Sequence, residues 1–208
     1  RLADLDTAEL RNRLADAREH ADSIVFTGGE VTLRNDLVEL VSHARELGFV
    51  TIQIQTNGRM FAYRKNCEEL VAAGANEFSP ALHGHTAELH DYLTRAKGSF
   101  VQTSRGIRNL KQLGQPVITN SVITRSNYRH LPALARLLLQ LDVDQYQFAF
   151  VHPLGTAQEG FNAVVPRLAL VARYVADGLD LGIRAGRVVM TEAITPCFLP
   201  GRERYIAE

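Results

Sequence analysis

Apolar and polar residues alternate along the chain in two repeating patterns, one with the spacing of helices and one with that of strands. From residue 7 to 22, apolar residues recur every three or four positions, which predicts a helix with Thr7 as its N-cap. The segment "SIVFTGG" predicts a short buried strand that ends in glycine. The segment "NDLVELVSHARELG" predicts a second helix, which Asn35 would cap and Gly48 would end.

The same alternation continues through most of the chain. Strands are predicted near residues 24, 50, 76, 117 and 146. Further helices are predicted at residues 66–73, over about 30 residues broken near Gly98, at residues 127–141 and at residues 166–179. Regular alternation of this kind predicts parallel strands joined by crossover helices, in either a doubly wound sheet or a complete or partial (β/α) barrel.

In both folds, the carboxyl ends of the strands meet at one edge, where binding and catalytic groups gather. The predicted strand ends read "TGGE", "QTNG", "SPALHGH", "NSVITR" and "FVHPLG". Each contains glycine or polar side chains, so we expect a functional site at this edge.

The last part of the chain departs from the alternation. Residues 186–208, "GRVVMTEAITPCFLPGRERYIAE", contain turn signals and no clear helix. We therefore expect a barrel-like domain at residues 1–185 and a C-terminal extension at residues 186–208 that closes over one end.

Composition narrows the class of protein. The 208 residues amount to one domain, with 23 basic and 23 acidic residues, so no basic field favours nucleic acid as a partner. The sequence shows no long apolar span and no signal peptide, which favours a cytoplasmic protein that does not enter a membrane. Two cysteines, Cys67 and Cys197, are too few for a disulfide framework or a cysteine-ligated metal site.

Four segments in this order resemble the radical S-adenosylmethionine (SAM) superfamily. "FTGGEVTLRNDLVELVSHARELGF" resembles its second strand and helix, and "TIQIQTNG" resembles its third strand. "NEFSPALHG" resembles the fourth strand, and "VITNSVITRSNYRHLPAL" the fifth strand with the turn after it. The resemblance covers roughly residues 7–155. It implies an α/β fold, a partial (β/α)6-type TIM barrel with parallel strands, whose first strand would lie outside this chain.

The resemblance also implies which residues would contact SAM. Gly28 and Gly29 would let the cofactor's methionine lie along the backbone, and Glu30 would accept a hydrogen bond from its ammonium group. Further contacts are implied for Thr56 and Asn57 after the third strand of the family. Three further contacts are implied on the later strands. Ser79 would reach the ribose or the carboxylate of the cofactor, Asn120 would supply a polar contact, and Val151 would pack against the adenine.

The superfamily's defining Cys-x3-Cys-x2-Cys motif, which ligates a [4Fe–4S] cluster, does not occur in these residues. We expect these ligands upstream of Arg1, and we expect the chain by itself to be inactive. With the cluster, the intact protein would cleave SAM reductively to a 5′-deoxyadenosyl radical, which abstracts hydrogen from a substrate. The resemblance implies a small-molecule or peptide substrate and an electron donor such as flavodoxin or ferredoxin. The residues that carry out catalysis are not identified.

Three histidines leave alternatives open. His83, His85 and His152 lie at predicted strand ends and could hold a metal, as in metal-dependent barrel hydrolases or aldolases. His83 and His152, with Arg125, could instead contact the substrate of a radical SAM enzyme. A third alternative is a non-catalytic relative without a cluster that acts as a binding module. Cys67 shares a helical face with apolar residues and is expected in the core, whereas Cys197 could be a packed loop residue, a redox thiol or a single ligand.

Overall fold

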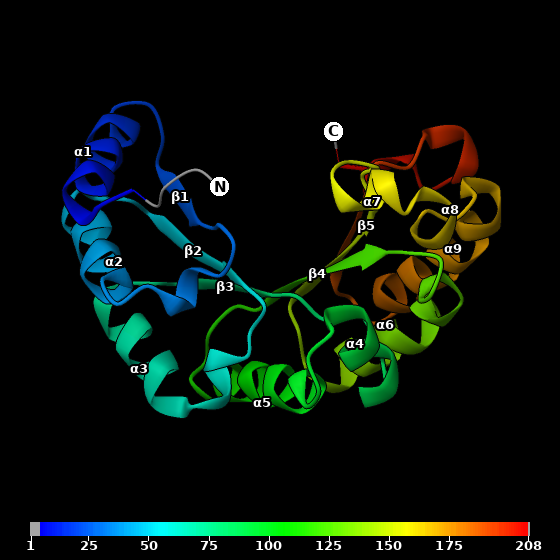
Figure 1. The fold of residues 1–208 in the computed structure, drawn as a ribbon, viewed down its shortest axis with the longest axis horizontal. Coiled ribbons are helices and arrows are strands. Elements are labelled where there is room, and N and C mark those ends of the chain that lie inside the picture. Colours follow the sequence, from blue (N-terminus) through cyan, green and yellow to red (C-terminus); the bar gives the residue numbers. More distant parts are fainter. Residues whose placement is uncertain (1–4, 208) are drawn as a thin grey trace.

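The computed structural model describes residues 5–207, and its strands form one open, curved layer. Within these residues the strands are β1 (Ser23–Phe26), β2 (Thr51–Thr56), β3 (Glu77–Pro80), β4 (Ile118–Ile123), β5 (Gln145–Phe150) and β6 (Val188–Glu192). They pair in parallel in the orders β1-β2-β3 and β4-β5-β6. The bridges Phe78↔Val117 and Ala81↔Asn120 join β3 to β4. The two sheets therefore form one arch, open on one side (Figure 1).

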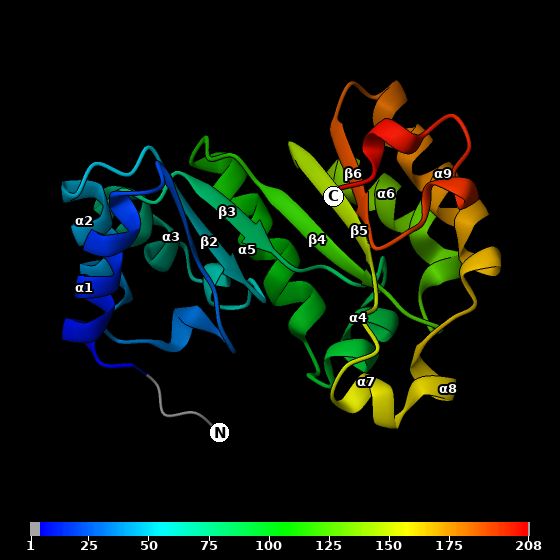
Figure 2. The same cartoon turned by 90° about the horizontal axis from the view of Figure 1, so that it is seen from above.

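The larger helices lie on the outer side of this arch (Figures 1 and 2). The helices are α1 (Thr7–Arg18), α2 (Leu37–Glu46), α3 (Arg64–Ala73), α4 (Ala87–Thr94), α5 (Ser99–Gln112), α6 (Leu131–Gln140), α7 (Thr156–Glu159), α8 (Phe161–Val164) and α9 (Leu168–Arg184). This arrangement confirms the predicted α/β class, the parallel strands and the partial TIM barrel. No helix within residues 5–207 has the length and apolar character needed to cross a membrane.

Alternation along the strands separates the apolar core from a polar inner face. In β2, Ile52 and Ile54 are buried, whereas Gln53 and Gln55 alternate with them and lie on the opposite face. The buried set on the helix side includes Phe78, Tyr146 and Phe148. Burial of these side chains between sheet and helices supplies most of the driving force for folding.

One feature of the helices was predicted correctly, and two predicted caps were wrong. The helical region near Gly98 is broken as predicted, because Gly98 has a φ of 84° between α4 and α5. The prediction of Thr7 as N-cap is wrong, since Asp6 accepts the hydrogen bond from Glu9 N at 2.8 Å. Asn35 does not cap α2, which begins after Asp36. Pro132 lies in the first turn of α6, where its missing N–H costs little.

The alternation of strands and helices extends further than predicted. Residues 188–192 form β6, which pairs in parallel with β5, although this segment was expected to depart from the alternation. β6 is short and follows closely after α9, which ends at Arg184. The change from helical spacing to strand spacing is therefore hard to recognise in the sequence. Beyond it, Ile206 bridges to Thr191 in parallel.

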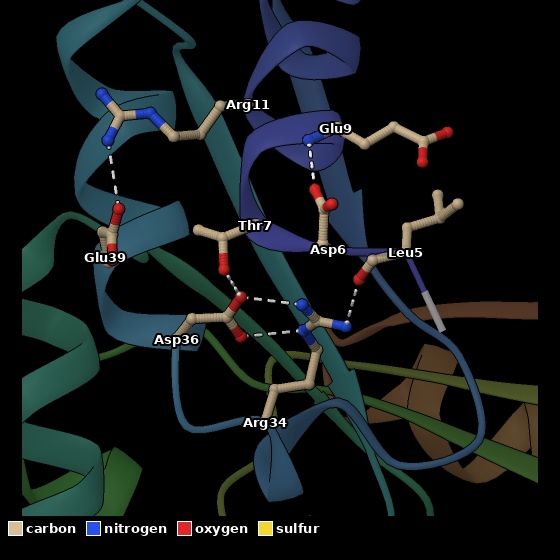
Figure 3. Close-up of polar contacts among 8 residues, drawn as sticks. All are labelled: Leu5, Asp6, Thr7, Glu9, Arg11, Arg34, Asp36 and Glu39. Carbon is tan, nitrogen blue, oxygen red and sulfur yellow. Dashed lines mark hydrogen bonds and ion pairs between the residues drawn. The ribbon is translucent and has the colours of Figure 1, made fainter. Parts of the chain in front are cut away.

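A network of polar contacts joins α1 to the loop that follows β1 (Figure 3). Arg34 donates to Asp36 Oδ1 from Nε at 2.9 Å and to Oδ2 from Nη2 at 2.7 Å. Arg34 also donates to the carbonyl oxygen of Leu5, and Thr7 donates to Asp36 Oδ2 at 2.6 Å. The Asp36 carboxylate is thereby held by two elements, which fixes the position of the loop before α2. Farther along the same two helices, Arg11 pairs with Glu39 in solvent.

We expect Asp36→Asn to lower the free energy of unfolding by about 1–2 kcal/mol, because a charge-assisted bidentate pair is lost. Hydrogen bonds from Arg34 and Thr7 lower the pKa of Asp36. The stabilisation is therefore present above the pKa of the unfolded carboxyl, and it is lost as the pH falls below about 4. Urea unfolding of both proteins at several pH values measures the difference.

The matched control is Glu39→Gln, which removes the exposed pair between the same helices. It should cost about 0–0.5 kcal/mol because solvent screens such pairs. Equal losses for the two variants, or a loss at Asp36 that does not shrink in acid, would contradict the role given to the partly buried network.

Candidate cofactor site at the carboxyl ends of the strands

The backbone after β1 is open to a large cavity. Gly28 has a φ of 155°, and at neither Gly28 nor Gly29 would a Cβ atom meet another described heavy atom within 4 Å beyond its chain neighbours. Both glycines, with Glu30, line a cavity of about 700 Å³ that α1 and α2 also border. Packing within the described chain therefore does not require two glycines. Their effect is to leave the backbone of this loop uncovered by the described side chains.

Glu30 is held in one position by donors from its own loop and from β2. Its Oε1 accepts hydrogen bonds from the hydroxyls of Thr32 and Thr56, both at 2.5 Å, and from Thr32 N at 3.1 Å. Its Oε2 accepts one from Asn57 N at 2.7 Å. Because a carboxylate oxygen has two lone pairs, Oε2 can accept one more donor. The carboxylate thus fixes the loop after β1 against the end of β2 and keeps acceptor capacity.

Thr56 has a different role from the one implied by its position in the sequence. Its buried hydroxyl donates its single proton to Glu30 and accepts a hydrogen bond from Gly58 N at 3.1 Å. It therefore positions Glu30 and has no proton left to donate to a ligand. The following Gly58 has a φ of 76°, and a Cβ there would lie 2.8 Å from Pro80. The turn after β2 thus packs tightly against the end of β3.

Three further residues of the predicted set lie on neighbouring strands. Ser79 is on β3 and is 6% exposed. Asn120 is on β4, beside Ala81, which follows β3 directly, and its Oδ1 is buried without a hydrogen-bond partner among the described residues. Val151 follows β5 directly and is 8% exposed. Parallel pairing brings these positions to the same side of the sheet as the loop that contains Glu30. The unpartnered oxygen of Asn120 is the feature that most directly favours a ligand.

The histidines do not come together as a metal site. His83 Nδ1 accepts a hydrogen bond from Val122 N at 3.2 Å, and His90 Nδ1 accepts one from His83 N at 3.0 Å. Burial lowers the pKa of both His83 and His90 to about 4, so both are neutral near pH 7. His85 stacks on His130 with ring centroids 5.1 Å apart. No group of three or more His, Cys, Asp or Glu within residues 5–207 could hold a metal ion.

The other predicted side chains are dispersed. Arg125 is exposed just after β4, where its backbone N–H donates to Val164 O at 2.8 Å. Cys67 is buried in α3 as predicted, and burial raises the pKa of its thiol to about 12. Cys197 is exposed in a short turn, where its thiol contacts the Thr195 hydroxyl.

Sequence reasoning missed two carboxylates, one within α4 and one at the end of β6. Asp91 accepts hydrogen bonds from Phe100 N at 2.8 Å and from the Ser99 hydroxyl at 2.9 Å, and so it caps α5. Glu192 ends β6 and lies 3.5 Å from His152, between Oε1 and Nε2. The β-branched run "VVMTE" was the available signal for Glu192, but residues 186–208 were interpreted as an extension.

Comparison with known proteins gives both a family and relatives. The family model described as "Radical SAM superfamily" matches residues 1–138. The chain is 32% identical over 170 residues to a PqqA peptide cyclase of Rhodopseudomonas palustris, covering 81% of this chain and 45% of that protein. It is also 32% identical over 136 residues to an AdoMet-dependent heme synthase of Oleidesulfovibrio alaskensis, covering 65% of this chain and 34% of the relative. The chain thus spans less than half the length of these relatives.

Solved structures agree with this match at the level of the fold. The structure of Streptococcus suis SuiB bound to S-adenosylmethionine superposes on 92% of this chain and 44% of SuiB, with a TM-score of 0.75 and 18% sequence identity. The relatives are named as enzymes. The family model covers more than half of this chain, and the matched part includes the Gly28–Glu30 loop. This chain belongs to the radical SAM superfamily.

Proposed function

We propose that the full-length protein is a radical SAM enzyme and that this chain supplies its SAM-binding edge. The observation that carries the proposal is the accessible backbone of Gly28 and Gly29 beside a carboxylate that is held in place on both sides. SAM is a cation with an ammonium group, which needs acceptors and close approach to the backbone. The loop after β1 offers both.

In this proposal, each residue of the edge has a distinct task. Glu30 Oε2 accepts a hydrogen bond from the ammonium group of SAM, while Thr56 keeps that carboxylate oriented. The Asn120 Oδ1 atom supplies an acceptor farther along the sheet. Three further residues, Ser79, Asn57 and Val151, border the same edge. They would contact the parts of SAM other than its ammonium group.

The residues present fit SAM but not an iron–sulfur cluster. A [4Fe–4S] cluster of this superfamily needs three thiolates, whereas the chain contains Cys67, which is buried in α3, and the distant Cys197. The ligands would therefore come from outside these 208 residues. When bound, SAM and the cluster supply a 5′-deoxyadenosyl radical for hydrogen abstraction. The task of this chain is to hold and orient the nucleotide and to limit access of water.

The substrate class is open within the superfamily. The relatives are named for a peptide substrate in one case and for heme synthesis in another, so membership does not select a substrate. We propose a small molecule or a peptide as substrate, an electron donor such as flavodoxin or ferredoxin, and action in the cytoplasm. The metal-dependent hydrolase alternative has no support from the arrangement of His83, His85 and His152.

Glu30→Gln in the full-length protein should weaken SAM binding about tenfold or more, because a charge-assisted hydrogen bond is replaced by a neutral one. Isothermal titration calorimetry under anaerobic conditions measures the affinity. The matched variant Thr56→Val removes a donor to Glu30 but keeps the carboxylate, so it should have a smaller effect. An unchanged affinity in Glu30→Gln would refute the role of Glu30. Equal losses in both variants would show that Glu30 acts only by fixing the loop.

Full-length protein that is reconstituted without oxygen with iron and sulfide should form 5′-deoxyadenosine from SAM when a chemical reductant is added. Liquid chromatography with mass spectrometry measures this product. Iron and acid-labile sulfide should be present together in the purified protein. Zinc without iron, or a reconstituted protein that never forms the nucleoside, would end the radical enzyme proposal and leave a binding module.

A further inference from the structure

The inner face of the arch carries acidic and neutral polar groups without basic ones. None of the six described strands contains Lys or Arg, and their two carboxylates are Glu77 and Glu192. Alternation places both carboxylates on the side away from the helices, where neighbouring positions are not fully buried. Glu77 accepts a hydrogen bond from Gln53 on the adjacent strand. A negative inner face of this kind favours cationic ligands.

Glu192 is the carboxylate of this face that remains accessible near the strand ends. Its side chain is 40% exposed, and it ends β6, which lies in the opposite arm of the arch from α1 and α2 (Figure 2). Its Oε2 accepts a hydrogen bond from Gln147 Nε2 at 2.6 Å, and its Oε1 lies 3.5 Å from His152 Nε2. Gln147 thus orients the carboxylate without neutralising it. The contact to His152 is longer and exposed, so another donor can replace it.

Hydrogen-bond acceptors continue from Glu192 across β5 to β4. Gln147 pairs in register with Asn120 on one side and with Met190 on the other. Because Gln147 donates through Nε2 to Glu192, its carbonyl oxygen is the group that it can still offer as an acceptor. Asn120 Oδ1 is buried and has no hydrogen-bond partner among residues 5–207. The three side chains therefore form a row of acceptors with a carboxylate at its accessible end.

We propose that Glu192, with the carbonyl oxygen of Gln147, binds a cationic nitrogen group of the substrate, either an ammonium or a guanidinium. This inference rests on the proposed function, because it assigns the substrate side of the same strand edge. An ammonium has three donors and no acceptor, and it therefore complements a row of acceptors that ends in a carboxylate. An anionic group would be repelled by Glu192. His152 acts as the group that the substrate's cation displaces.

The test uses the full-length protein and a lysine peptide as probe. The peptide acetyl-Gly-Lys-Gly-amide has one ammonium group, and the same peptide with an acetylated lysine has the same backbone without the charge. Saturation-transfer NMR titrations give the two dissociation constants. We expect the charged peptide to bind at millimolar or lower concentration and the acetylated peptide to bind at least about fivefold more weakly.

Variants then assign the binding to Glu192. Glu192→Gln should weaken binding of the charged peptide about fivefold or more, because the carboxylate is lost while the shape is kept. His152→Ala should bind this peptide as tightly as the wild type or more tightly, since the displaced partner is absent. The control Glu46→Gln removes a carboxylate with 70% exposure from the outer helix α2 and should change nothing. A His152→Ala variant that loses binding would show that the Glu192–His152 pair is only structural.

Other outcomes would overturn the site as well. Equal binding of the charged and acetylated peptides, no detectable binding of either, or full binding by Glu192→Gln each contradict the proposal. Failure of the site is distinguishable from failure of the proposed function in the wild-type protein. A protein that cleaves SAM but ignores the lysine peptide lacks only this site, whereas one that binds the peptide but never SAM lacks the proposed function.

Discussion

The candidate site depends on one carboxylate that is fixed between the ends of two neighbouring strands. A charged group near the edge of an apolar core is costly unless donors surround it, and Glu30 receives donors from Thr32, Thr56 and Asn57 N. These bonds determine the path of the loop after β1. They hold the backbone of Gly28 and Gly29 towards the cavity, where no described side chain covers it. The accessibility of that backbone follows from the Glu30 contacts.

A second layer of contacts supports this loop from outside the barrel. Arg34 and Asp36 form a bidentate pair that also holds Thr7 and the Leu5 carbonyl, so α1 is tied to the loop that leads into α2. The segment between Glu30 and α2 is short, and both of its ends are fixed. A preorganised loop loses little conformational entropy when a ligand binds.

The alternation of side chains gives the arch two different faces with different tasks. The outer face carries Ile52, Ile54 and Phe148 into the core, and the residues between them project inwards. The inward residues need not pack against helices, so they can be polar, as Gln53, Gln147 and Glu192 are. The outer face of the sheet thereby contributes to stability, and the inner face is free to carry polar groups that can contact a ligand. Membership in the superfamily does not by itself select a substrate, so the substrate must be inferred from the side chains of the site.

The sequence by itself determined the parallel α/β fold, the family and the loop at Gly28–Glu30, because period, order and local turn chemistry are properties of the chain. It did not determine what the Thr56 hydroxyl contacts, which residue caps α1, or that residues 188–192 form a strand beside β5. It also left open a metal site at His83, His85 and His152, but the described residues contain no group of three such ligands that could hold a metal ion. Only the tertiary structure decided these points. Each depends on pairs of groups far apart in the chain, and spacing along a sequence carries no information on which distant donor reaches which acceptor.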